Sequence, residues 1–429
     1  MLFCHIDYLD ENFCVRKAGY VRVKGARIEA VSETPLASEE GEEVYDGRGR
    51  LLMPALVNAH AHAPMTLLRG WGENLNLQDW LNQRIFPFEA KLTDEAICAG
   101  TTLALAEMIR TGTVSSTEMY FGAEAMARAL VASGAKMNLS VGVTCFGDGD
   151  LADQPRQQEA ERLIKNWNGA GEGRLVADLS LHAEYTSTPK AVRQMAQRAA
   201  GTGLNMQVHM AETKTETDEC VERHGKTPAR YFYDLGLFDA HTTAAHGVWL
   251  TDEDIPLLKE KDVTIASCPA SNMKLASGFC RTPALLAAGV RVALGTDGAA
   301  SNNNLDMFEE MKLFALAPKG AFGDPRAVSA QQALRAATLS GAQAQGRWDT
   351  GAVKAGNRAD LIVLDCSAPW WTPGHDRAAD IVYAAKGTDV CLTMADGRVL
   401  YRDGEYLTID IERARHDAAA AAAAIAAQF

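Results

Sequence analysis

The sequence lacks the features that direct a chain into or across a membrane. No apolar run approaches the ~20 residues needed to span a bilayer. Residues 1–7 are not a basic start followed by a sustained apolar stretch, which a secretory signal requires. The nine cysteines are scattered between Cys4 and Cys391 without a Cys-x-x-Cys pair, a pattern typical of reduced thiols rather than of a disulfide framework. We therefore expect a cytoplasmic protein with no membrane partner.

Positive charge is also scarce. The 42 lysines and arginines face 55 aspartates and glutamates, and the formal net charge is −13. Such a surface repels polyanions, so nucleic acid is not an expected partner, whereas a nucleoside has no phosphate to repel. The combination of His-x-Glu with Pro-Cys-x-x-Cys that marks nucleic-acid deaminases is missing. The Gly-x-Gly-x-x-Gly turn of dinucleotide-binding folds is missing too.

The middle of the chain alternates between two kinds of segment. Amphipathic stretches of helical length, such as 93–110 and 189–201, separate short apolar runs. The apolar runs cover residues 51–58, 113–118, 138–144, 175–181, 204–210, 242–247, 263–268 and 290–296. Strands that alternate with helices indicate parallel βα units, and eight such units close a (β/α)₈ barrel. We predict an α/β fold with a TIM barrel over residues 51–349, and an open doubly wound sheet is the alternative.

The two ends of the chain have a different pattern. Residues 1–50 contain short strands and turns without a long helical pattern, and residues from 350 onward return to the same style. We predict that 1–50 and 350–429 combine into a small β-sandwich domain. Its last segment, 411–429, contains an alanine run and is expected to form a terminal helix.

Polar residues with metal-binding chemistry follow the predicted strands. His60 and His62 stand two residues apart at the end of the first strand, so both side chains project from the same face. Two imidazoles in that position are able to hold one cation. The later strands end in similar residues, namely His209 with Glu212, His246 and Asp297. Because reactive groups of such barrels lie at the carboxyl ends of the strands, we expect all of them at one mouth.

These residues resemble the motifs of the amidohydrolase superfamily, in its mononuclear-zinc deaminase branch. The resemblance covers nearly the whole chain and rests on four motifs, Asn58-Ala59-His60-Ala61-His62, His209-Met210-Ala211-Glu212-Thr213, Ala245-His246-Gly247 and Gly295-Thr296-Asp297-Gly298. It implies one Zn²⁺ per subunit held by His60, His62, His209 and Asp297, with Glu212 and His246 beside the metal-bound water. Fe²⁺ or another divalent metal also fits these ligand types. The resemblance further implies a homo-oligomer.

The implied roles have a physical basis. Three imidazoles and a carboxylate leave a coordination position for water, and the cation lowers the pKa of that water to ~7. Asp297 then serves as ligand and proton acceptor, and His246 orients the water. Glu212 protonates a ring nitrogen beside the attacked carbon and helps the amine to leave. In the alternative interpretation, Glu212 only orients His209.

The segment after His62 resembles that of S-adenosylhomocysteine and 5′-methylthioadenosine deaminases. In that family the residue matching Glu89 accepts hydrogen bonds from ribose hydroxyls, and the one matching Trp80 packs against the nucleoside. His182 matches a histidine that contacts the purine. Ser301 either reaches the base or caps the next helix. In the alternatives, Glu89 opens a helix or faces solvent, and Trp80 anchors its loop to the core.

We predict a zinc-dependent hydrolytic deaminase that converts 5′-methylthioadenosine, S-adenosylhomocysteine or adenosine to the inosine analogue and ammonia. Arg156 and Arg162 lie near the region that binds an amino-acid tail in some relatives, but no motif distinguishes them. The methylthio nucleoside or adenosine is therefore the favoured substrate. The enzymatic alternative is a deaminase or chlorohydrolase of a free heterocycle such as guanine, a pterin, cytosine or a triazine. An alternative of another class is a barrel that serves as a non-catalytic scaffold.

Overall fold

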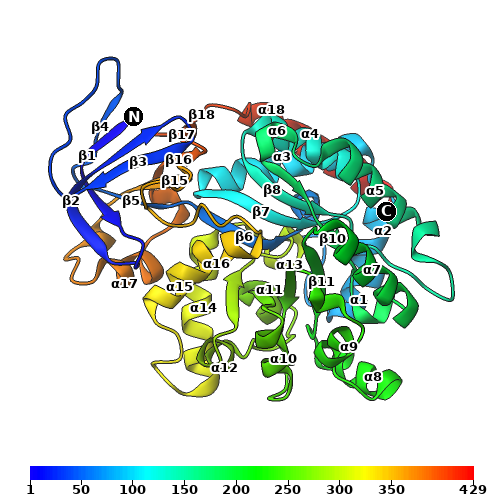
Figure 1. The fold of residues 1–429 in the computed structure, drawn as a ribbon. Helices are drawn as coiled ribbons and strands as arrows, with labels where there is room; N and C mark the ends of the chain where they lie inside the picture. Colours follow the sequence, from blue (N-terminus) through cyan, green and yellow to red (C-terminus); the bar gives the residue numbers. More distant parts are fainter.

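The computed structural model describes residues 1–429, and its strands form two assemblies that lie side by side (Figure 1). One assembly is a nine-stranded sheet built from both ends of the chain. Its strands are β1 (Leu2–Leu9), β2 (Val15–Lys24), β3 (Arg27–Ser32), β4 (Val44–Asp46), β5 (Arg50–Pro54), β15 (Leu361–Asp365), β16 (Val390–Ala395), β17 (Arg398–Arg402) and β18 (Glu405–Tyr406). The two chain ends meet where β5 pairs antiparallel with β15. Apolar side chains from both ends form one buried cluster against this sheet.

The other assembly holds the parallel strands of the middle of the chain. They are β6 (Leu56–Ala61), β7 (Thr113–Met119), β8 (Lys136–Ser140), β9 (Leu175–Ala177), β10 (Leu179–Ser180), β11 (Met206–Met210), β12 (Thr242–His246), β13 (Thr264–Ser267) and β14 (Arg291–Leu294). Strands β6 to β9 pair in order, and so do β10 to β14. Strands β9 and β10 are consecutive in the chain, so the segment 175–180 contributes the edge strand of each parallel sheet.

The two parallel sheets also meet at their other edges. A parallel bridge joins Ala61 to Asp297, and the Asp297 amide donates to the His60 carbonyl at 3.0 Å. Gly295 allows this close approach, because a Cβ there would lie 2.8 Å from the His60 carbonyl oxygen. These contacts place the residues after β6 beside those after β14, as in a fold of the predicted (β/α)₈ type.

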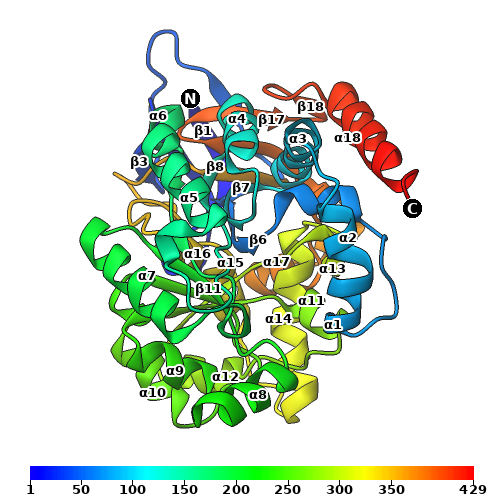
Figure 2. The ribbon, with the colours of Figure 1, turned by 90° about the vertical axis from the view of Figure 1, so that its right-hand side faces the viewer.

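Helices surround the parallel strands (Figures 1 and 2). The longer ones are α3 (Asp94–Arg110), α4 (Ala123–Ser133), α5 (Pro155–Trp167), α7 (Pro189–Thr202), α8 (Lys214–His224), α14 (Met307–Phe322), α15 (Ala330–Ala337) and α18 (Ile411–Ala426). The shorter ones are α6 (Ala170–Gly173), α9 (Pro228–Asp234), α10 (Asp254–Glu260), α11 (Pro269–Lys274), α12 (Thr282–Ala287), α13 (Ala299–Asn302), α16 (Leu339–Ala344) and α17 (Arg377–Tyr383). A threonine side chain caps the N-terminus of each of the helices α3, α7, α8 and α9. The Thr93 side chain, for example, accepts a hydrogen bond from the Ala96 amide at the start of α3. The predicted terminal helix is present as α18, which packs against α3. None of the helices has the length and apolar character needed to cross a bilayer.

The structure corrects the first predicted strand. The apolar run 51–58 is not one strand but two, because β5 ends at Pro54 and β6 begins at Leu56. Between them, the Ala55 amide donates to the carbonyl of Asp360, which precedes β15 of the nine-stranded sheet. The Leu56 amide donates instead to the carbonyl of Gly112, which precedes the parallel strand β7. Residues 51–54, expected in the barrel, therefore lie in the nine-stranded sheet.

A buried ion cluster joins the two assemblies. The Lys136 ammonium at the start of β8 donates to both carboxylate oxygens of Asp360 at 2.8 and 2.6 Å, and to Asp396 at 2.7 Å. The side chains of Lys136 and Asp360 are only 1% and 4% exposed. Removing one member of such a cluster leaves an uncompensated buried charge.

We expect the Lys136→Met substitution to lower the free energy of unfolding by about 3–5 kcal/mol, since Asp360 then stays buried without its cation. Denaturant unfolding followed by circular dichroism measures the change. Lys17→Met is the matched control, because Lys17 pairs with Asp7 at a similar distance, 2.8 Å, but is 64% exposed. The control should change stability by less than about 1 kcal/mol. Equal effects of the two substitutions would contradict the assignment.

Candidate metal centre and active site

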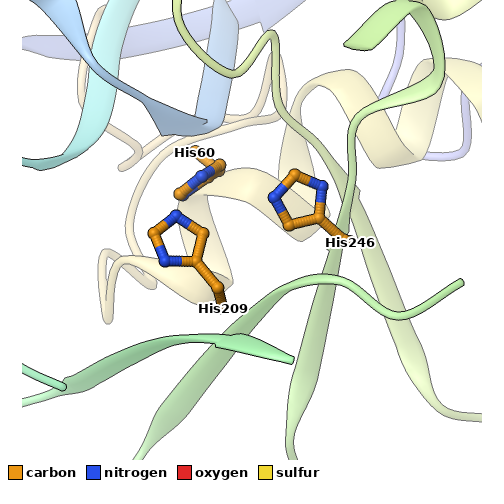
Figure 3. Close-up of side chains that lie close together, drawn as sticks. All are labelled: His60, His209 and His246. Atoms are coloured by element: carbon orange, nitrogen blue, oxygen red, sulfur yellow. The ribbon is translucent and has the colours of Figure 1, made fainter. Parts of the chain in front are cut away.

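Four histidines and an aspartate converge at the carboxyl ends of the parallel strands. His246 is the last residue of β12, and His60 and His209 are each the last residue but one of β6 and β11. Figure 3 shows the rings of these three side chains turned toward one another from separate strands. His62 follows β6 directly, and Asp297 follows β14. The structure thus brings together residues that are far apart in the sequence.

The nitrogen and oxygen atoms of these side chains lie within metal-binding range of one another. Two groups have donor atoms that are all within 4.8 Å, namely His60 with His209 and His246, and His60 with His62 and Asp297. The His62 Nε2 atom lies 3.2 Å from Asp297 Oδ1 and 3.4 Å from His209 Nε2. The His60 Nε2 atom is buried and has no hydrogen-bond partner in the protein. A buried polar atom without a partner is unfavourable unless something else binds it.

The outer nitrogens of the rings fix how the inner ones point. The Nδ1 atoms of His62 and His209 each lie 2.7 Å from a backbone carbonyl oxygen, those of Met119 and His182 respectively. A carbonyl only accepts hydrogen bonds, so each Nδ1 carries the proton. In the neutral ring, the Nε2 lone pair is then directed at the cluster, which is the tautomer that a metal ligand requires.

Burial and neighbouring charges set the protonation of this cluster. Burial lowers the pKa of His60 and of His209 well below the usual value, and the adjacent histidines lower it further. Burial alone would raise the pKa of Asp297, but the hydrogen bond and charge of His62 outweigh it and hold that pKa well below its usual range. These shifts favour neutral rings at His60 and His209 and an ionised carboxylate at Asp297. Burial would lower the pKa of His62, but the hydrogen bond and the charge of Asp297 outweigh it and raise that pKa.

Asp297 is held by two hydroxyl groups on its far side. Its Oδ2 atom accepts hydrogen bonds from Ser271 Oγ at 2.6 Å and from Ser301 Oγ at 2.8 Å, which leaves Oδ1 facing the histidines. The backbone at three of the strand ends is also unusual, with positive φ at Ala211 (51°), His246 (75°) and Asp297 (60°). Residues other than glycine seldom adopt this conformation, and such strain is concentrated at functional sites.

Glu212 and His246 lie next to each other beside this cluster. Glu212 Oε2 is 3.8 Å from His246 Nε2, and both side chains are buried. Burial raises the pKa of Glu212, although the charge of His246 opposes the shift. The opposite ring nitrogen of His246, Nδ1, is hydrogen-bonded to Asn272 Oδ1 at 2.9 Å. A carboxyl group with a raised pKa beside a cation site is suited to proton transfer.

Glu216 holds the backbone next to Glu212, and this role was not predicted from the sequence. Its carboxylate accepts hydrogen bonds from the backbone amides of Ala211 at 2.8 Å and Glu212 at 2.7 Å. Burial and the nearby Glu212 raise its pKa to about 7. A signal was present in the sequence, because an acidic residue three positions after Thr213, the N-cap of α8, commonly binds amides at a helix start.

A cavity of about 550 Å³ opens above these residues. One wall is the segment formed by α1 (Leu77–Trp80), the π-helical turn Leu81–Ile85 and α2 (Phe86–Glu89). Residues of both kinds, metal-ligand candidates and substrate-binding candidates, line it. They include His62, Trp80, Glu89, Tyr120, Arg156, His182, His209, Glu212, His246 and Asp297.

The predicted substrate-binding residues differ in whether they line the cavity. Trp80, Glu89 and His182 line the cavity, and burial lowers the pKa of His182 to about 4, so its ring is neutral at pH 7. Ser301 does not line the cavity, and its hydroxyl donates to Asp297 instead. This hydrogen bond is a role that the sequence did not indicate, and a contact between Ser301 and the base stays a prediction. Of the two arginines, Arg156 lines the cavity and Arg162 does not.

Comparisons with known proteins agree with this arrangement. Residues 51–400 match the Amidohydrolase family. The chain is 44% identical over 377 residues to a 5-methylthioadenosine/S-adenosylhomocysteine deaminase of Moorella thermoacetica, which covers 88% of this chain and 87% of that protein. It is 39% identical over 417 residues to a 5′-deoxyadenosine deaminase of Methanosarcina acetivorans, with 96% and 94% covered. The crystal structure of an adenosine deaminase from Xanthomonas campestris with bound zinc superimposes with a TM-score of 0.92 at 33% identity, covering 99% of this chain and 98% of that one.

Proposed function

The chain belongs to the amidohydrolase family, and on that basis we propose that it is a zinc-dependent hydrolytic deaminase of adenosine-type nucleosides. The reaction replaces the 6-amino group of the purine by oxygen, with water as the second substrate and ammonia as the second product. One observation carries the proposal. A single cavity is lined both by His62, His209, His246 and Asp297 and by Glu89 and Trp80. The named relatives act on the same class of compound.

The donor set fits a divalent metal ion. His60, His62, His209 and Asp297 would hold it, and the buried, unpartnered Nε2 of His60 supports this assignment. When bound, such an ion lowers the pKa of a water ligand to about 7, so that hydroxide is available at neutral pH. The hydroxyl groups of Ser271 and Ser301 keep Asp297 Oδ1 turned toward the site. Ser301 thus acts as a positioning residue for Asp297.

Three side chains of this chain move or hold protons in the proposed reaction. Asp297 Oδ1 accepts a proton from the attacking water. Glu212, whose pKa is raised by burial, donates its proton to N1 of the purine. It then takes up the second proton of the attacking water and passes it to the departing amino nitrogen, and the proton held by Asp297 returns Glu212 to its protonated form. His246 Nε2 lies 3.8 Å from Glu212 Oε2 and orients the attacking oxygen between them. Asn272 fixes the ring of His246 from behind.

The remaining part of the cavity would bind the sugar and its 5′ group. A carboxylate is able to accept hydrogen bonds from two adjacent hydroxyl groups, which suits Glu89 to the ribose. Trp80, which is 5% exposed, offers an apolar face to the nucleoside. Arg156 supplies a positive charge in the same cavity, so a 5′ substituent with a carboxylate is also accommodated.

An ammonia-release assay on the zinc-loaded protein tests the proposal. We expect turnover of 5′-methylthioadenosine, adenosine and S-adenosylhomocysteine, and no turnover of guanine, because guanine has no ribose for Glu89 to bind. Turnover of guanine alone would overturn the substrate assignment and favour a free-heterocycle deaminase. A metal-loaded protein that is inert on all four compounds would instead favour a non-catalytic scaffold.

A further inference from the structure

Tyr120 occupies a distinctive position in the wall of the cavity. It directly follows β7, is 5% exposed and lines the cavity. Its hydroxyl donates a hydrogen bond of 2.5 Å to Oε1 of Glu89, which lies at the end of α2. This is a short hydrogen bond to a charged acceptor, the kind that contributes most to geometry and free energy. It connects the barrel strands to the separate segment that carries Glu89.

The hydrogen bond leaves one half of the Glu89 carboxylate available. No protein group is hydrogen-bonded to Oε2 of Glu89, and this oxygen is not enclosed by the protein. Burial raises the pKa of Glu89, whereas the hydrogen bond from Tyr120 and the charge of Arg156 oppose that shift. Tyr120 thus favours the ionised carboxylate of Glu89, a residue that lines the cavity, and leaves its second oxygen without a protein partner.

Tyr120 is itself rigidly placed. Its backbone amide donates to the Ser140 carbonyl of β8 at 3.0 Å. The ring stacks on Phe121 with centroids 4.5 Å apart and planes 16° apart, and the Arg156 guanidinium lies 4.1 Å from the centre of the Phe121 ring. Burial and the adjacent Glu89 raise the pKa of Tyr120 well above its usual value, so the hydroxyl remains a donor. A donor with so little freedom is able to orient a flexible glutamate at little entropic cost.

We infer that Tyr120 is a specificity-determining residue that aims the free oxygen of Glu89 at the ribose hydroxyls and so makes the enzyme prefer substrates with an intact 2′,3′-diol. The inference rests on the proposed function, because it concerns the sugar part of the same substrate. Tyr120 is a positioning residue, since its hydroxyl is used by Glu89. It follows that Tyr120 acts only on substrates that offer hydroxyl groups to Glu89.

Pairing enzyme variants with substrates that lack hydroxyls tests this inference. The kcat/KM of the zinc-loaded wild type, Tyr120→Phe and Glu89→Gln is measured for adenosine and for 2′,3′-dideoxyadenosine. We expect Tyr120→Phe to lower kcat/KM for adenosine by about tenfold, mainly through KM, because one hydrogen bond to a charged group is lost. For the dideoxy nucleoside the change should stay within about twofold, because no diol is present for the aimed carboxylate to bind. Calorimetric Kd values for both nucleosides on the metal-free variants provide a readout that is independent of turnover.

The control is Tyr233→Phe. Tyr233 donates a hydrogen bond of 2.8 Å to Glu260 on the exposed surface, so this variant loses the same kind of interaction outside the cavity. It should behave as the wild type with both nucleosides. Circular dichroism and zinc content show whether each variant keeps its fold and its metal.

The outcomes separate the inference from the proposed function. If Tyr120→Phe lowers kcat/KM for adenosine and for dideoxyadenosine by the same factor, the role of Tyr120 is structural and the inference is overturned. The preference for the diol is the ratio of kcat/KM for adenosine to kcat/KM for dideoxyadenosine. If Glu89→Gln abolishes this preference but Tyr120→Phe keeps it, the inference fails while the proposed function stands. If the wild type deaminates neither nucleoside, the proposed function itself fails, and the inference fails with it.

Discussion

The Asp297→Asn substitution is expected to lower kcat by at least about 10³-fold and to reduce the zinc content well below one ion per chain. Asp297 is the only carboxylate in the two groups of clustered donor atoms, and its depressed pKa keeps it ionised. Its Oδ1 atom lies 3.2 Å from His62 Nε2 and 3.7 Å from His60 Nε2. Asparagine removes the negative charge and the ability to accept a proton from water. Steady-state turnover and elemental analysis measure the two losses.

The hydroxyl groups of Ser271 and Ser301 make the expected loss of zinc in Asp297→Asn larger. They donate to Oδ2, so an amide NH₂ group in that place would face two donors, and the side chain would turn its oxygen away from the metal. Asp262→Asn is the control, because Asp262 is 59% exposed and pairs with Arg291 outside the cavity. That variant should keep its zinc and its turnover. An Asp297→Asn protein with full zinc content and undiminished kcat would refute the metal assignment.

The apolar runs of the sequence placed several histidines and acidic residues at predicted strand ends, and the resemblance to the amidohydrolase motifs selected the metal-ligand candidates among them. His60 and His62 share a motif, and the parallel arrangement of the strands implies that His209 and Asp297 end at the same mouth. The structure brings all four within reach of one another, although their roles remain proposals. What the sequence could not supply was the set of side chains that hold these groups in place. Asn272 in α11 and His246 at the end of β12 are 26 residues apart in the sequence, yet their side chains lie 2.9 Å apart in the structure.

The same limit applies to the substrate cavity. Glu89 was identified by resemblance, but its partner Tyr120 lies 31 residues further along the chain, and no periodicity connects the two. Arg156 carried no distinctive motif, and its place in the cavity follows from where α5 begins. For Ser301 the sequence left two roles open, and the structure shows a hydrogen bond to Asp297 that neither role includes. Tertiary contacts therefore decide these roles.

For the fold, the sequence predicted the type of barrel but not the exact limits of its first strand. Alternating apolar and amphipathic segments identified the barrel type, which the structure and the family comparison confirm. The division of run 51–58 into β5 and β6 was missed because every residue in it except Asn58 is apolar. Pro54 was the available signal, since a residue without an amide hydrogen is confined to strand edges and ends. It marks the place where the chain leaves one sheet for the other.

Replacing Glu212 with glutamine is expected to lower kcat by roughly 10²–10⁴-fold while KM and zinc content stay close to the wild type. Glutamine keeps the shape and the hydrogen-bonding capacity of the side chain but is unable to release or take up a proton. Glu212 is not a member of either group of clustered donor atoms, so the metal should be retained. The backbone of residue 212 remains held by Glu216, which preserves the geometry of the variant. Turnover of adenosine and elemental analysis, measured on the same preparation, test both parts.

This experiment also distinguishes the two interpretations of Glu212. If Glu212 only orients His209, the glutamine variant should lose zinc or bind it more weakly, and added zinc should restore much of the turnover. If Glu212 transfers the proton, added zinc should restore nothing. Glu219→Gln is the matched control on α8, the helix that follows Glu212, because Glu219 is 53% exposed and pairs with Arg223 at 3.0 Å. A Glu212→Gln protein with full zinc content and a kcat within about tenfold of the wild type would exclude Glu212 as the proton donor, because general acid catalysis contributes at least about 10²-fold.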